Sequence, residues 1–331
     1  MRHESSVTSI SWIPSEAMSG LMRLPMDIGL GHYDDPPPDV IDDLEALRKA
    51  DRFRFANELR AFIEVEDGEI VDAGYLGGGH IGATTMNLGV GSVSIAAVPF
   101  DDLQRDPVIN GTTARFVQTA GGRTGSPFPR RVPHPPFVRL TAPTAWTTLA
   151  LTIHANGQSE LEVVGASPFP RHWIYDRDGK LAQKSGTTDY KAWTEKEHEE
   201  DTPWGGVDSE ALVTQVETAL ERELSLTIMR EGKKPQIREI DQGDTLTEQG
   251  EEGDELFLLL DGVARVDVDG EGLAEIGPGT VVGERAILEG GTRTATLTAV
   301  TPLRVAVADV ESVDRDALMT LSEGHRREEQ A

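Results

Sequence analysis

The last third of the sequence alternates short β-rich runs with glycines, and this pattern constrains the fold more than any other feature. The runs cover residues 236–240, 256–260, 263–268, 273–276, 296–300 and 303–308. Glycines at positions 243, 250, 253, 262, 270, 272, 277 and 279 punctuate this stretch. Short strands at close spacing with turn residues between them are typical of an antiparallel barrel or jelly roll. We therefore predict a β-roll for this part of the chain.

One segment of this stretch, residues 282–296 with the sequence VGERAILEGGTRTAT, combines groups that bind a phosphorylated sugar. Glu284 and a short apolar run precede Gly290 and Gly291, and Arg293 follows them. Glycines let backbone N–H groups turn towards an anion, an arginine supplies the countercharge, and a carboxylate accepts hydrogen bonds from hydroxyls. The segment therefore predicts a site for a ligand that carries a phosphate and a ribose.

The glycine and acidic positions also follow the pattern of a known family. The matching positions are Gly243, Gly250, Gly253-Asp254, Leu256-Phe257, Gly262, Gly277-Pro278-Gly279 and Gly283-Glu284. Residues 236–322 thereby resemble the cyclic nucleotide-binding domain of catabolite-activator-type regulators, cyclic-nucleotide-dependent kinases and gated channels. The resemblance implies a β-roll with short flanking helices.

The resemblance also implies which residues bind the ligand. Glu284 would accept the ribose 2′-hydroxyl and Arg293 would pair with the cyclic phosphate, at the interval from Gly283 that the family usually has. The backbone N–H of Ala286 and the hydroxyl of Thr294 would complete the phosphate and base contacts. The ligand would be cAMP or cGMP, because Thr294 suits either, and we predict no metal ion and no catalytic residue. The predicted nucleotide-binding residues are Gly283, Glu284, Arg285, Ala286, Arg293 and Thr294.

The sequence departs from the family pattern in two places. Residues 282–296 correspond to the phosphate-binding cassette of the family. Here Val282 replaces the usual phenylalanine, Arg285 replaces a usual apolar residue, and Thr292 stands where a proline is frequent. These changes remove no ligand contact. After a predicted helix at residues 310–321, only SEGHRREEQA remains. That segment is shorter than the helix that covers the base in the family, and no helix-turn-helix follows it.

The rest of the chain predicts a mainly β (α+β) protein. Residues 1–205 form a β-rich domain of uncertain topology, with β-hairpins at Asp67-Gly68 and at Asn156-Gly157, where a type I′ turn is expected. Residues 206–232 form a linking helix, capped by Asp208 or Ser209, with an apolar stripe that includes Leu212, Val216, Leu220, Leu224 and Ile228. The nucleotide-binding domain then covers residues 233–322, and residues 323–331 are a tail.

Composition excludes several classes of function. The formal net charge of -26 repels a polyanion, so nucleic acid is not an expected partner. There is no cysteine, which removes disulfides and thiolate chemistry. Neither a signal peptide nor an apolar run long enough to span a membrane is present, so we expect a cytoplasmic protein.

The sequence favours a regulatory protein that senses cAMP or cGMP and modulates its N-terminal domain or a partner by an allosteric population shift. One alternative is an assembly or adaptor protein with a degenerate nucleotide domain, and a homo-oligomer or protein partner held through the N-terminal domain stays open. Another is a nucleotide-gated enzyme using His154, His172 and Asp176, although no catalytic spacing accompanies these residues.

Overall fold

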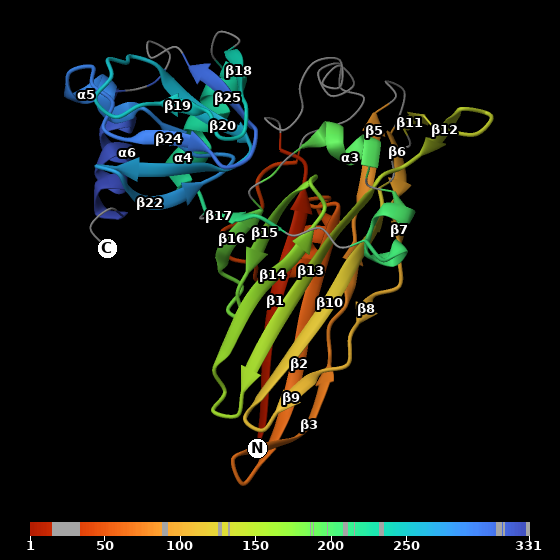
Figure 1. Ribbon diagram of the computed structural model, residues 1–331. Coiled ribbons are helices and arrows are strands. Elements are labelled where there is room, and N and C mark those ends of the chain that lie inside the picture. Colours follow the sequence, from red (N-terminus) through yellow and green to blue (C-terminus); the bar gives the residue numbers. More distant parts are fainter. Residues whose placement is uncertain are drawn as a thin grey trace. The chain divides into compact units, whose positions relative to one another are not determined.

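The protein is described by a computed structural model and forms two compact units (Figure 1). Met1–Val213 makes up the first unit, apart from Gly186–Thr188, and Thr214–Ala331 makes up most of the second. The structure describes residues 1–14, 34–87, 92–124, 128–131, 133–185, 187, 189–196, 198–207, 211–214, 216–231, 235–308, 313 and 315–328.

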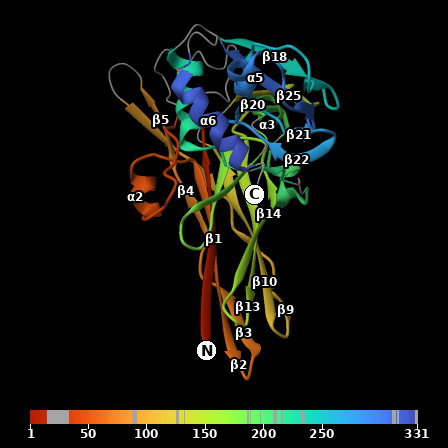
Figure 2. The same cartoon turned by 90° about the vertical axis from the view of Figure 1, so that its left-hand side faces the viewer.

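The first unit is built from two antiparallel sheets. One sheet has the strand order β17-β16-β15-β1-β2-β3, with β4 paired to β2, and the other has the order β14-β13-β10-β7, with β8 and β9 paired to β10. The long strands β1, β2, β10 and β13 run side by side through this unit (Figure 1, Figure 2). The strands of the two sheets are β1 (Arg2–Trp12), β2 (Phe55–Glu66), β3 (Glu69–Tyr75), β4 (Gly79–Ile81), β7 (Val98–Pro99), β8 (Leu103–Gln104), β9 (Val108–Asn110), β10 (Thr113–Arg123), β13 (Thr144–His154), β14 (Ser159–Ala166), β15 (Arg171–Tyr175), β16 (Leu181–Ser185) and β17 (Val213–Thr214).

Shorter elements complete the first unit. Two additional hairpins pair β5 (Ala83–Asn87) with β6 (Ser92–Ala96) and β11 (Phe128–Arg131) with β12 (Val138–Thr141). The helices are α2 (Leu44–Lys49), which is capped by the Asp43 side chain, α3 (Tyr190–Lys196), and the 3₁₀ turns η3 (Glu199–Asp201) and η4 (Pro203–Gly205).

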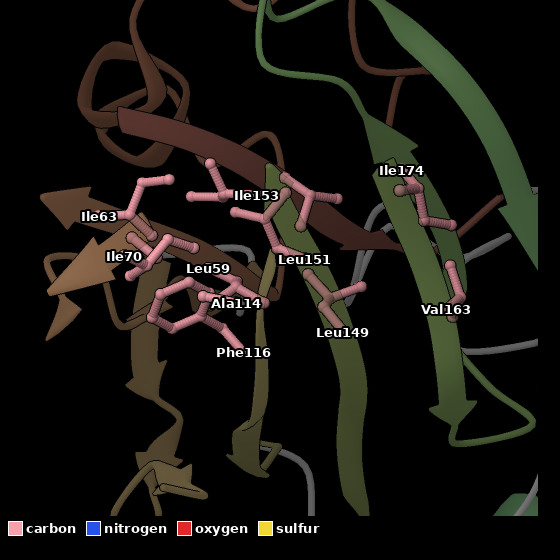
Figure 3. Close-up of a cluster of buried hydrophobic side chains, with 12 residues drawn as sticks. Leu59, Ile63, Ile70, Ala114, Phe116, Leu149, Leu151, Ile153, Val163 and Ile174 are labelled. Carbon is pink, nitrogen blue, oxygen red and sulfur yellow. The ribbon is translucent and has the colours of Figure 1, made fainter. Parts of the chain in front are cut away.

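Alternating apolar side chains from both sheets form the core of the first unit. In β2, Leu59, Ala61 and Ile63 are buried on one face, as the two-residue period predicts. They pack with Phe116 of β10 and Leu151 of β13 from the facing sheet (Figure 3). The contacts between the two inner faces make this unit a β-sandwich.

The two predicted hairpins exist, but their turns differ. Asp67 and Gly68 both have positive φ, of 51° and 85°, as a type I′ turn requires. At the second hairpin Gly157 has a φ of 84°, whereas Asn156 is not among the described residues with positive φ. The Gly157 N–H donates to His154 O at 2.8 Å, while the His154 N–H donates to Gln158 O at 2.9 Å, so this is a three-residue loop and the expected type I′ turn is wrong.

The second unit is a β-roll, as predicted. Its two four-stranded sheets have the orders β18-β25-β20-β23 and β19-β24-β21-β22, and all pairs are antiparallel. The strands are β18 (Gln236–Ile240), β19 (Thr245–Thr247), β20 (Leu256–Asp261), β21 (Ala264–Val268), β22 (Glu271–Ile276), β23 (Val281–Val282), β24 (Thr296–Ala299) and β25 (Leu303–Ala308). The helices are α4 (Ala219–Leu226), the π-helical turn η5 (Thr227–Glu231), α5 (Glu284–Glu289) and α6 (Arg315–Glu328).

Two helices of the second unit differ from the prediction. The predicted linking helix spans residues 206–232, but Leu212 is not helical, Val213–Thr214 is a strand and α4 begins only at Ala219. A capping box explains the start, because the Thr218 side chain accepts from the Glu221 N–H while Glu221 accepts from the Thr218 N–H. The predicted caps Asp208 and Ser209 lie outside the described residues. At the other end, α6 continues to Glu328, past the predicted end of the domain.

Among the described residues, no helix has both the length and the apolar character needed to cross a bilayer.

A row of polar side chains crosses the core of the first unit. The Asn57 amide donates to Thr147 O at 2.9 Å and its oxygen accepts from Gln118 Nε2 at 2.7 Å. Ser9 Oγ lies 2.6 Å from Thr147 Oγ1. These four residues come from β1, β2, β10 and β13, so their hydrogen bonds join the two sheets in one register.

Replacing Asn57 by alanine should therefore lower the free energy of unfolding of the first unit by about 2–3 kcal/mol, because it leaves buried partners without a hydrogen bond. All five tryptophans lie in this unit, so urea unfolding followed by tryptophan fluorescence measures it. Asn110→Ala on the exposed strand β9 is the matched control and should change little. Equal stability of the two variants would show that the polar row contributes nothing.

Candidate functional site

The cassette predicted from the sequence connects β23 to β24 in the second unit. Gly283 caps α5 with a φ of 97°, and Gly290 and Gly291 end it with φ of 108° and 85°. Residues with side chains rarely adopt these values, so the glycines are required for the chain to turn sharply at both ends of one short helix. The cassette then leads directly to Arg293.

A cavity of about 370 Å³ lies against this cassette, entirely within the second unit. All six predicted binding residues, Gly283, Glu284, Arg285, Ala286, Arg293 and Thr294, lie in its wall. Their contacts with a ligand stay a prediction. The other lining residues are Val216, Glu217, Glu221, Thr247, Val266, Leu273, Ala274, Ile276, Thr280, Val282, Ala295, Leu297 and His325.

Arg293 presents a buried cation to this cavity, with a relative exposure of 7%. Its NH1 donates to Glu255 O at 2.8 Å, and its guanidinium lies 5.1 Å from the centre of the Phe257 ring. Burial lowers the pKa of Arg293, while the Glu255 and Asp254 carboxylates oppose that shift. Its Nε and NH2 groups make no hydrogen bond to any residue that the structure describes, so they are available to an anion in the cavity.

The loop before β20 is shaped to receive this side chain. The Gly253 N–H donates to Gly291 O at 2.8 Å, and the Arg293 N–H donates to Glu251 O at the same distance. A Cβ atom on Gly253 would lie 2.2 Å from Arg293 Nε. A side chain at position 253 would therefore displace the guanidinium from this position, because the guanidinium occupies the space where that side chain would begin.

Glu284, the first residue of α5, is the buried anion of the cavity, with a relative exposure of 3%. Its Oε1 lies 3.1 Å from Nδ1 of His325, on α6. Helix α6 lies beside α5 (Figure 2), which brings these two side chains together across 41 residues of sequence.

Glu221 of α4 is a second buried carboxylate in the same wall. It accepts hydrogen bonds from the Thr218 N–H at 2.7 Å and the Val281 N–H at 3.2 Å, and it lies 3.7 Å from His325 Nε2. Burial raises the pKa of Glu221, but the neighbouring His325 imidazole and the hydrogen bond from Thr218 outweigh it and lower the pKa overall.

His325 is correspondingly basic. Burial lowers the pKa of its imidazole, but the neighbouring Glu221 and Glu284 carboxylates raise it to about 10. Its side chain therefore carries a proton at neutral pH and bridges two carboxylates as an imidazolium.

Sequence reasoning missed both Glu221 and His325. The Thr218-x-x-Glu221 spacing is a capping-box signal that could have placed the start of α4. No local signal identifies His325, because residues 323–331 are expected to be a tail.

The weak catalytic candidates of the first unit are not brought together. His172 is fully buried and bonds to Ser11 and Ser167, and burial lowers its pKa to about 4 despite the latter bond. His154 pairs with Glu160, and Asp176 accepts from N–H groups of its own turn. Within the described ranges no hydrogen bond or ion pair joins the three residues, and no cluster of acidic and histidine side chains could hold a metal ion.

Comparison with known proteins gives matches for the second unit. A family model described as the cyclic nucleotide-binding domain matches residues 237–315. The cGMP-dependent protein kinase egl-4 of Caenorhabditis briggsae is 40% identical over 67 residues, which are 20% of this chain and 9% of the kinase. The Caenorhabditis elegans kinase of the same name has the same identity and coverage. The chain thus spans less than a tenth of the length of these curated relatives.

Two solved structures are also similar. A PKAR CBD2 domain bound to Sp-2Cl-cAMPS is 24% identical, with 33% of this chain and 79% of that chain covered and a TM-score of 0.26. A regulatory subunit of a cAMP-independent protein kinase A from Trypanosoma brucei is 26% identical, with coverages of 29% and 35% and a TM-score of 0.25. With the family model and the β-roll in agreement, residues 237–315 of this chain belong to the cyclic nucleotide-binding domain family.

Proposed function

We propose that the second unit binds cAMP or cGMP in the cavity beside α5 and that the protein is a cyclic-nucleotide-sensing regulator. The observation that carries this proposal is that a buried cation, Arg293, and a buried anion, Glu284, line the same cavity at opposite ends of one cassette. A cyclic nucleotide has the matching groups, an anionic phosphate next to a ribose hydroxyl.

At the phosphate end, the guanidinium of Arg293 supplies the countercharge. Its Nε and NH2 groups make no hydrogen bond within the described part of the chain, and burial strengthens their interaction with an anion by excluding water. The phosphate would take up these donors, and the loop that ends at Gly253 holds the guanidinium in place.

At the sugar end, the Glu284 carboxylate has one oxygen directed to His325 and acceptor capacity left for a hydroxyl. The cavity of about 370 Å³ falls within the range of about 300–1,000 Å³ typical of small-molecule sites. Apolar side chains such as Val266, Leu273 and Ile276 line the remaining wall, where a base can pack.

Both nucleotides remain in the proposal. The curated relatives are named as cGMP-dependent kinases, whereas one of the similar structures holds a cAMP analogue. Thr294 lines the cavity next to Arg293, and its hydroxyl can serve either base.

The regulatory output would follow from a shift in population between two arrangements of the second unit. Helices α4 and α6 both contribute side chains to the cavity, Glu221 and His325, so a ligand in the cavity would lie against elements outside the β-roll. The first unit, or a partner bound to it, would receive this change.

Isothermal titration of the full chain with cAMP and with cGMP tests nucleotide binding. Arg293→Gln should weaken binding about tenfold to a hundredfold, because a charge-assisted hydrogen bond contributes about 1.5–3 kcal/mol. Arg265→Gln, at an exposed arginine paired with Asp267, is the control and should bind normally. Absence of heat from the folded wild-type protein with either nucleotide would disprove the proposal.

A second variant moves the guanidinium without removing its charge. Gly253→Ala places a methyl group in the position of Arg293 Nε and should weaken nucleotide binding at least tenfold. Gly272→Ala is the matched control, because its Cβ would lie at an ordinary 3.5 Å from Asp267 Oδ1. Titration of both proteins, with melting curves to establish folding, measures the effect, and unaltered binding by Gly253→Ala would contradict the role of Arg293.

The sugar contact is tested with 2′-deoxy-cAMP and 2′-deoxy-cGMP. Wild-type protein should bind the deoxy compound about tenfold or more weakly than its parent, because a hydrogen bond to a charged acceptor is lost. In Glu284→Gln this difference should shrink to less than about threefold. Glu271→Gln, on the exposed end of β22, should keep the full difference. Equal binding of parent and deoxy compound by the wild type would place the hydroxyl elsewhere.

A further inference from the structure

His325 of α6 lines the cavity, and neither the cassette pattern nor the family match covers it. Its two ring nitrogens face two different helices. Nδ1 lies 3.1 Å from Oε1 of Glu284 on α5, and Nε2 lies 3.7 Å from Oε1 of Glu221 on α4. The side chain of His325 on α6 therefore contacts both α5 and α4 at the edge of the cavity.

We propose that His325 is a positioning residue for nucleotide binding. Its protonated imidazole holds the Glu284 carboxylate in place for the ribose hydroxyl, and it thereby couples nucleotide binding to the positions of α4 and α6. This inference rests on the proposed function and deepens it.

The first support is the cost of burying two carboxylates together. Glu221 and Glu284 are each about 3% exposed, and two like charges this deeply buried require a cation between them. The imidazolium supplies that charge, with a hydrogen bond from Nδ1 to Glu284 and an ion pair between Nε2 and Glu221. Without it, the two buried carboxylates would repel each other, and Glu284 would turn away from the position in which it can accept a ribose hydroxyl.

The second support is that the bridge and the ligand space exist together. The cavity of about 370 Å³ is bounded by His325 while its ring bonds to Glu284. A nucleotide could therefore enter without breaking the bridge and use the remaining capacity of Glu284. This geometry favours cooperation between His325 and the ligand over competition for the carboxylate.

The ion pairs with Glu221 and Glu284 are the dominant charge interactions of His325. Only Glu221 and Glu284 lie within ion-pair distance of the imidazole among the described residues. The other charged groups on the packed helices and in the cavity wall are Arg222 and Glu223 on α4, Arg285 and Glu289 on α5, and Glu217 and Arg293.

The ligand-free arm of the test measures the bridge itself. In side-chain NMR spectra of the full chain, His325 should titrate near pH 10, far above an ordinary histidine. Glu221→Gln should lower that midpoint by at least one pH unit. A midpoint near 6.5 in the wild type would overturn the bridge, whatever the nucleotide result.

The sign of the pH effect on stability follows from the same pKa. Because the folded value of about 10 exceeds the unfolded value of 6.5, the bridge stabilises fully below pH 6.5 and its contribution is lost as pH rises towards 10. Glu221 acts in the opposite range, because its lowered pKa makes its contribution disappear as pH falls through the folded value.

The nucleotide arm compares His325→Gln, which is neutral, with His325→Arg, which keeps a positive charge at every accessible pH. His325→Gln should bind the nucleotide about tenfold more weakly, and His325→Arg should recover affinity to within about threefold of wild type. His80→Gln, at a histidine–glutamate pair of the first unit, should match the wild type.

The pH profile separates positioning from a general structural role. Wild-type affinity should fall between about pH 9 and 10.5, as the imidazole loses its proton, whereas the affinity of His325→Arg should stay level. Equal or tighter binding by His325→Gln, or failure of folded His325→Arg to recover affinity, would overturn the proposal. Failure of the proposed function is distinct, because wild-type protein would then bind no nucleotide even if the NMR midpoint lies near pH 10.

Discussion

The buried charge of Arg293 is the constraint on which the arrangement of the second unit depends. A guanidinium inside a β-roll needs an acceptor, room and a polarisable neighbour. The carbonyl of Glu255, the missing side chain at Gly253 and the face of Phe257 provide them. The glycines that punctuate this part of the sequence are therefore more than turn residues, because at least one clears space for the charged group.

Three ionisable groups on three helices line another part of the cavity wall. The protonated His325 forms ion pairs with both Glu221 and Glu284, and the charges of the three groups sum to a single negative charge. Such an arrangement is sensitive to anything that changes the carboxylate or the imidazole, including a sugar hydroxyl at Glu284. The helices before and after the β-roll thus meet at the same group that the proposed ligand would contact.

In the first unit, neutral side chains connect the two sheets through hydrogen bonds. Its β-sandwich carries a row of hydroxyl and amide side chains, Ser9, Asn57, Gln118 and Thr147, beside the apolar cluster of its core. A slip of one residue would turn the apolar face of a strand away from the core, and the directional hydrogen bonds between the sheets add to this constraint because they are satisfied in one register only. His172 of the same unit is buried and bonds to Ser11 and Ser167.

The sequence by itself determined the β-roll, the positions of its turns, and the cassette from Gly283 to Thr294, because strand period, glycine placement and cassette spacing are local signals. Only the tertiary structure decided that both faces of most of β13 are buried, where the Trp193 indole of α3 donates to the carbonyl of Thr144. It also decided that α4 begins at Ala219. Finally, it decided that His325 of α6 lies beside Glu284 and Glu221. These contacts join residues far apart in the chain, and no local pattern encodes which distant carboxylate a histidine will meet.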